Sequence, residues 1–123
     1  MKLAAVSALA TAGLIFIQLI TGGNYLISGV SLEHPYTGLI VWASAAVSVI
    51  LAFFSEPEDW TFRLSTVAVL ILVSTAGVTS SKSIMVIHYS FGILAFASGI
   101  VAAACALIWN SFSQRETKGK TTG

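Results

Sequence analysis

The sequence predicts an all-α integral membrane protein: a four-helix up-down-up-down bundle built from two parallel helical-hairpin repeats. The first observation is composition, because 56% of the 123 residues are apolar and 9% are charged, whereas a soluble domain carries about 25% charged residues. The second is four long apolar segments, and the third is an internal match between two stretches of the chain. The net charge is +1 with no basic patch, so nothing indicates a nucleic acid partner.

The four apolar segments are expected to span a membrane, since a spanning helix needs about 20 mostly apolar residues. We place them roughly at residues 3–25, 32–54, 64–79 and 84–109. The start of the chain resembles a secretory signal, but its apolar run continues to Ile20, so we interpret it as a retained first span. Short connections favour antiparallel neighbours. Residues 1–112 then form the transmembrane domain, and residues 113–123 form a polar tail that we expect to fray.

The positions of Lys and Arg predict the orientation in the membrane. Five basic residues fall at one side of the predicted spans: Lys2, Arg63, Arg115, Lys118 and Lys120. Lys82 stands alone at the other side. Since cytoplasmic loops carry the excess of Lys and Arg, we expect a multi-pass protein of the cell membrane with both termini in the cytoplasm.

An internal repeat relates the second and fourth spans. Residues 34–44 align without a gap with residues 88–98, so that His34 matches His88, and these are the only histidines in the chain. The repeats extend over about residues 13–54 and 64–109. Because each repeat contains two spans, both run in the same direction, as in parallel-repeat transporters. Both histidines should therefore lie near the outer face, at similar depths.

The matched histidines are candidate axial ligands of a haem iron. Gly38 and Gly92 follow them by one helical turn and leave clearance for a flat macrocycle; Trp42 and Phe96, also matched, could flank its ring. Ionisable groups inside membrane spans are costly and usually functional. Packing or a proton relay is the alternative, and zinc or copper would need further ligands, for which Glu33 is the nearby candidate.

Several polar residues are secondary candidates. Glu33 could stabilise the dipole of the second helix or act as a catalytic carboxylate at the haem edge. Gln18, Thr21 and Asn24 recur along the first span and could bond a neighbouring helix or line a polar seam. A ligating histidine needs a partner for its second nitrogen; the candidates are Ser31, Thr37, Ser90 and backbone carbonyls.

Together these features resemble the haem A synthase (haem O oxygenase) family, which serves cytochrome oxidase assembly. Residues 13–23, GLIFIQLITGG, resemble the family's first-helix run, and residues 70–79 followed by Val86-Ile87-His88 resemble its third and fourth helices. Full-length members contain two four-helix halves, each with a histidine near the outer start of its second and fourth helices. The resemblance covers about residues 13–105 and implies a half-size member with His34 and His88 as haem ligands. The family's glutamate typically lies three residues before the first histidine, where this chain has Ser31.

The resemblance implies haem b as cofactor, or haem O as a substrate that is oxidised toward haem A in haem A biosynthesis. An alternative with the same ligands is a small b-type cytochrome that transfers electrons in a quinone-linked respiratory complex. A second alternative is a non-haem membrane subunit or assembly factor. The expected partners are membrane lipid, a second copy of the chain, and a respiratory oxidase or quinone partner.

Overall fold

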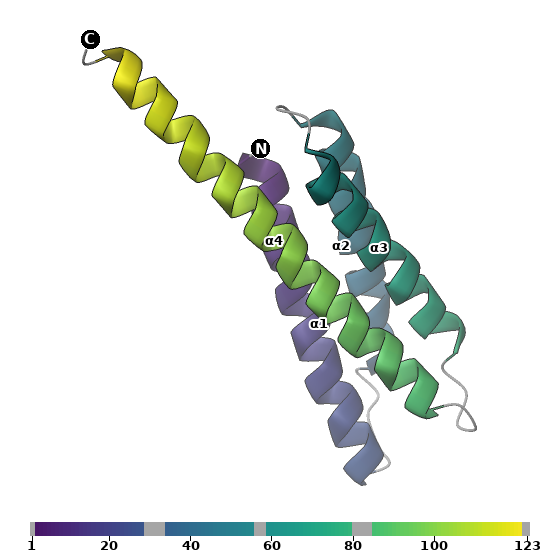
Figure 1. The fold of residues 1–123 in the computed structure, drawn as a ribbon. Coiled ribbons are helices and arrows are strands. Elements are labelled where there is room, and N and C mark those ends of the chain that lie inside the picture. The colour runs from purple at the N-terminus through teal and green to yellow at the C-terminus, as the bar shows by residue number, and fades with distance from the viewer. Residues whose placement is uncertain (1, 29–33, 56–58, 80–84, 122–123) are drawn as a thin grey trace.

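The computed structural model describes residues 2–28, 34–55, 59–79 and 85–121, with residues 24–28 described by their backbone alone. They form four helices in an up-down-up-down arrangement (Figure 1): α1 (Lys2–Ser28), α2 (His34–Phe54), α3 (Trp60–Val78) and α4 (Met85–Thr121). Each helix packs against the next, and α4 also packs against α1, so that α2 and α4 lie across the bundle from each other. The described part of the chain is therefore all-helical, as predicted.

All four helices are long and apolar enough to cross a membrane. Large apolar side chains are exposed on the outside of every one of them, for example Leu3, Leu39, Ile71 and Val86. A water-soluble bundle turns mostly polar residues outward. The surface of this bundle is instead compatible with surrounding lipid.

The third helix begins earlier than the sequence pattern indicates, at Trp60 rather than at residue 64. The cause is an N-cap at Asp59. Its carboxylate accepts hydrogen bonds from the backbone N–H groups of Thr61 (2.9 Å) and Phe62 (3.2 Å). Because a cap of this kind satisfies the free donors of the first turn, the helix extends back into the polar end of the segment.

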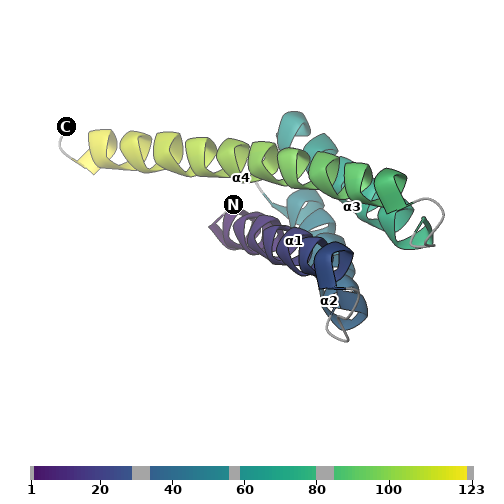
Figure 2. The same cartoon turned by 90° about the horizontal axis from the view of Figure 1, so that it is seen from below.

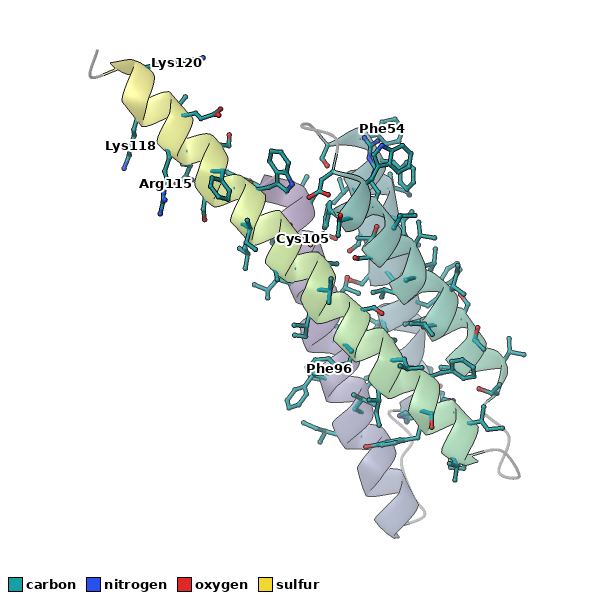
Figure 3. The ribbon with its side chains drawn as sticks, in the orientation of Figure 1. Phe54, Phe96, Cys105, Arg115, Lys118 and Lys120 are labelled. Atoms are coloured by element: carbon teal, nitrogen blue, oxygen red, sulfur yellow. The ribbon has the colours of Figure 1, made fainter. Side chains whose placement is uncertain are left out.

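The prediction of a frayed polar tail was wrong, because α4 continues as a helix to Thr121. Its last turns extend past the other three helices (Figure 1, Figure 2), and this projecting part carries Arg115, Lys118 and Lys120 (Figure 3). Basic side chains near a helix C-terminus interact favourably with the helix dipole. This interaction favours helix even where no neighbour covers the side chains.

Small side chains dominate the interior. One buried cluster, at the end of the bundle where α1 begins, comprises Ala4, Ala5, Ala8, Ala52, Phe62, Ala102, Ala103 and Ala106. A second cluster, toward the start of α2, comprises Ile15, Val41, Ala45, Val69 and Ala95. Small residues allow membrane helices to approach closely, which explains why so few large side chains are fully buried.

Most buried positions of the two hairpins coincide at the spacing that aligns the histidines, although Arg63 is buried where its match Leu9 is exposed. The buried residues of α2 are Val41, Ala45, Ser48 and Ala52. Their counterparts 54 positions later, all buried, are Ala95, Gly99, Ala102 and Ala106. Likewise Ala8, Ala12 and Ile15 of α1 match the buried Phe62, Thr66 and Val69 of α3. The same offset therefore aligns the inward faces of α1 with α3 and of α2 with α4.

A cluster of hydroxyl groups joins α1 to α2 in the half of the bundle away from the histidines. Thr11 and Ser48 are buried, and their side-chain oxygens lie 2.9 Å apart. Thr11 also lies 2.7 Å from the hydroxyl of Ser44, and Ser48 lies 2.7 Å from that of Ser7. Hydrogen bonds of this kind hold helices together where water is absent.

Arg63 secures the end of α2. Its side chain is buried, and it donates from Nε to the carbonyl of Ala52 (3.2 Å) and from Nη2 to that of Phe53 (3.1 Å). The guanidinium lies 5.4 Å from the ring centres of both Phe53 and Trp60. Arg63 thus satisfies terminal carbonyls of α2 that have no partner within their own helix.

Candidate cofactor site between the two histidines

The structure brings His34 and His88 together across the bundle. Their ring centres are 5.9 Å apart and their planes cross at 73°. Two imidazoles on opposite sides of one metal ion have nitrogens about 2 Å from the metal, which puts their ring centres about 6 Å apart. The planes of axial imidazoles can rotate about the metal–nitrogen axis, so the crossing angle is compatible with this geometry.

His88 is held by a backbone carbonyl. Its Nδ1 lies 2.6 Å from the carbonyl oxygen of Ala76 in α3. Because a carbonyl can only accept, Nδ1 carries the proton, and in the neutral ring Nε2 then carries the lone pair. Metal-ligating histidines usually donate their other ring N–H in this way.

His34 is held by residues of α1. Thr21 donates its hydroxyl hydrogen to the carbonyl of Gln18 (3.0 Å), so its oxygen can accept from Nδ1 of His34 at 3.3 Å. Nε2 of His34 then carries the lone pair and accepts a hydrogen bond from the amide nitrogen of Gln18 at 3.3 Å, which a metal ion at Nε2 would replace. The same amide donates to the His34 carbonyl at 2.9 Å. Thr37 donates to the Gln18 side-chain oxygen and fixes the orientation of that amide.

The two histidines contact matched positions of the repeat. His88 bonds to Ala76, and its partner His34 lies over Gly22, which precedes Ala76 by 54 positions. A Cβ added at Gly22 would lie 3.0 Å from Cε1 of His34, closer than ordinary van der Waals contact. Gly22 therefore provides the space that the His34 ring occupies.

A cavity of about 890 Å³ adjoins the histidines and is lined by residues of all four helices. Its volume falls within the range of about 300–1,000 Å³ found for small-molecule and cofactor sites. Most of the lining is apolar, and its polar groups include both imidazoles, Gln18 and Tyr89. Such a cavity suits a largely apolar ligand that is anchored at a few points.

The cavity contains most of the candidate residues. Gly38, Gly92 and Trp42 line it. Phe96 is not among the lining residues, because its ring packs 5.6 Å from that of Phe16, between α4 and α1. Glu33, the proposed catalytic carboxylate, lies outside the described residues, as does Ser31, and the side chain of Asn24 is not described.

The space beside Gly38 and Gly92 is occupied by side chains of α1. A Cβ at Gly38 would lie 3.1 Å from the amide nitrogen of Gln18, and one at Gly92 would lie 3.0 Å from Cδ2 of Leu19. The glycines thus admit Gln18 and Leu19 to the cavity wall.

The sequence pattern did not identify the partner of His34. Thr37 was a candidate but bonds to Gln18, and Ser90 donates to Val86 within its own helix. Thr21 is the residue found beside His34 Nδ1. Thr21 and Thr75 occupy matched positions of the repeat, next to Gly22 and Ala76, which contact the two histidines. This match was the sequence feature that could have identified Thr21.

The described metal-ligating side chains that meet at this site are the two imidazoles, and Glu33, the further candidate ligand, lies outside the described residues. Among the residues that the structure describes, no group of three or more His, Cys, Asp or Glu side chains could hold a metal ion. Zinc sites use at least three protein ligands. In a haem the macrocycle supplies four nitrogens, so two axial imidazoles complete the iron coordination.

In comparisons with known proteins, no family model, curated protein or solved structure matches this chain.

Proposed function

We propose that this protein is an integral membrane haem protein that holds one b-type haem between His34 and His88. The observation that carries the proposal is the pairing of the two imidazoles, 5.9 Å apart, beside a largely apolar cavity. Hydrogen bonds to Nδ1 leave the lone pair of each ring on Nε2. A haem iron requires that state of its histidine ligands.

The four helices cross the membrane with the histidine end outside and both termini in the cytoplasm. The described basic residues support this orientation, since Lys2 starts α1, Arg63 starts α3, and Arg115, Lys118 and Lys120 end α4. All of these positions lie at the end of the bundle away from the histidines. An excess of Lys and Arg marks the cytoplasmic side.

The bundle consists of two hairpin repeats related by an axis along the membrane normal. The coincidence of buried positions at one offset supports this relation, because independent hairpins would have no reason to share it. The repeat explains why the two ligands lie at nearly the same depth: His34 is the first residue of α2 and His88 the fourth of α4.

When bound, the haem supplies reversible one-electron chemistry. The chain's own residues hold and orient it. Thr21 and the Ala76 carbonyl fix the imidazole orientations, and Ile15, Val41 and Ala95 provide apolar walls that limit water. With His34 and His88 both holding the iron, no site would remain for a substrate on the metal, which would favour electron transfer to a quinone or respiratory partner.

A second candidate is the oxidation of haem O toward haem A, which the resemblance to haem A synthase suggests. Gln18 and Gly22 belong to the stretch that carries the resemblance, and both lie against His34. In this case the tetrapyrrole is a substrate held by the same two histidines.

The proposal is tested with the protein purified in detergent. We expect a dithionite-reduced spectrum with a sharp alpha band, and a pyridine haemochrome spectrum that identifies the haem type. A protein purified without such a band contradicts both candidates. Coexpression with a source of haem O, followed by pigment extraction, separates them: haem A supports the oxidation, and its absence supports electron transfer.

A further inference from the structure

The exposed part of the cavity lining lies on α2 and α3. Its most exposed lining residues belong to these two helices: Pro35, Leu39, Trp42, Gly77 and Val78. Leu39 is 68% exposed and Val78 is 86% exposed. The lining residues from α1 and α4 are buried or half-buried. This exposed rim is mainly apolar, and Leu39 and Trp42 extend it along the side of α2.

The matched interface on the other side, between α4 and α1, is closed. Phe96 packs against Phe16 with ring centres 5.6 Å apart. Leu19 fills the space beside Gly92, and the Tyr89 hydroxyl reaches the Leu19 carbonyl at 3.5 Å. The two matched interfaces thus differ. Large side chains close the interface between α4 and α1, whereas the interface between α2 and α3 leaves part of the cavity lining exposed.

One hydrogen bond spans the exposed rim between α2 and α3. The indole N–H of Trp42 donates to the hydroxyl oxygen of Ser74 at 3.1 Å, and Ser74 donates its own hydrogen to the Leu70 carbonyl at 2.8 Å. The Ser74 hydroxyl is thereby oriented to accept from the indole. Trp42 is 47% exposed, so its ring lies at the exposed rim and connects α2 to α3.

We propose that haem enters and leaves the cavity laterally, from the hydrocarbon layer of the membrane, through a portal between α2 and α3 that the Trp42–Ser74 hydrogen bond narrows. Trp42 lies eight residues into α2, roughly 12 Å from its start at 1.5 Å per residue. That depth is within a hydrocarbon core of about 30 Å. Haem is an amphiphile that partitions into bilayers, and the apolar rim suits its passage. This inference rests on the proposed function.

The test compares leucine substitutions at two glycines where an added Cβ has open space. A Cβ added at Gly77 or at Gly13 meets nothing within 4 Å. Gly77 lines the portal, whereas Gly13 lies on the exposed face of α1. Apoprotein is reconstituted in liposomes that contain haem, and uptake is followed by the growth of the Soret band. We expect Gly77→Leu to slow uptake several-fold and Gly13→Leu to match the wild type.

A second variant acts in the opposite direction. Ser74→Ala removes the acceptor of the Trp42 hydrogen bond, so we expect uptake, and haem loss to added apomyoglobin, to become about threefold faster, the effect of one typical interhelical hydrogen bond. A misfolded Ser74→Ala variant would not take up haem faster and still show the wild-type low-spin spectrum. Wild-type rates in both Gly77→Leu and Ser74→Ala would overturn the portal and leave the haem proposal standing. A wild-type protein that takes up no haem would overturn both.

Discussion

Nδ1 of His34 lies 3.3 Å from the hydroxyl of Thr21 in α1, and Nδ1 of His88 lies 2.6 Å from the carbonyl of Ala76 in α3. Each histidine is therefore held by the helix that precedes it in its own hairpin. The two hairpins reach this result with different acceptors, a side chain in one and the backbone in the other. In both, the proton is on Nδ1 and the lone pair is on Nε2.

Removal of either imidazole should abolish haem retention. In His34→Ala or His88→Ala the proposed haem would lose one of its two protein ligands, and we expect the purified variant to lack low-spin haem in its absorbance and electron paramagnetic resonance spectra. Val86→Ala is the control, since Val86 precedes His88 by two residues and is 81% exposed. A full complement of low-spin haem in either histidine variant would contradict the ligand assignment.

Two adjacent glycines should respond differently to the same change. Gly22→Ala places a methyl group 3.0 Å from Cε1 of His34, whereas the methyl of Gly23→Ala meets the Tyr89 hydroxyl at an ordinary 3.7 Å. We expect Gly22→Ala to displace the His34 ring, weaken haem retention during gel filtration and shift the g values of the low-spin signal. Gly23→Ala should keep wild-type spectra and retention. Equal effects in the two variants would show that contact with the ring is not the cause.

Gln18 should act as a positioning residue for His34. Its amide donates to the carbonyl of His34 at 2.9 Å, which holds the backbone that carries the imidazole, whereas its contact with Nε2 would give way to the iron. Gln18→Met keeps the length of the side chain and removes these contacts, and loss of a group that orients a ligand typically costs about 10–100-fold in metal-site affinity. We expect haem affinity to fall at least about tenfold, while the low-spin spectrum persists.

The matched control for that variant is Ile17→Met, because Ile17 is the neighbouring residue and is 50% exposed. Haem titration of the apoprotein measures the affinity of both. If Gln18→Met binds haem as tightly as Ile17→Met, the amide has no positioning role.

Much of the architecture could be predicted from the sequence because the determining features are periodic or repeated. Apolar length indicated four helices, and the repeat offset indicated that His34 and His88 meet. Helix ends were less predictable: the start of α3 depends on the Asp59 cap, and α4 continues through a polar stretch that composition alone assigns to a tail. Both depend on interactions at single residues rather than on hydropathy.

Which side chains line the cavity depends on which helix faces meet, and hydropathy does not determine how the faces pair. Gly38 and Gly92 were predicted to leave room for a macrocycle, but the side chains nearest to the space above them are Gln18 and Leu19 of α1. Trp42 and Phe96 are equivalent in the repeat, yet one lines the cavity and the other packs against Phe16. A sequence repeat predicts equivalent positions but not equivalent neighbours.

The hydroxyl cluster between α1 and α2 should contribute to stability without affecting the site. Ser48→Ala removes the hydroxyl that lies 2.7 Å from Ser7 and 2.9 Å from Thr11. Its repeat counterpart is Ala102, which is also buried, so an alanine suits a position of this kind. Interhelical hydrogen bonds in membranes average about 0.6 kcal/mol. We therefore expect the free energy of unfolding to fall by about 1 kcal/mol for the two contacts.

The measurement is the midpoint of unfolding in mixed detergent micelles, with the haem spectrum recorded in parallel. Ser48 lies 14 residues from His34 along α2, roughly 21 Å at 1.5 Å per residue, so the spectrum should not change. Ser65→Ala is the control, because Ser65 bonds to the Thr61 carbonyl within its own helix and its loss should leave the midpoint nearly unchanged. An altered low-spin spectrum in Ser48→Ala would show that the cluster is coupled to the histidines, and an unchanged midpoint would show that its hydrogen bonds contribute nothing to stability.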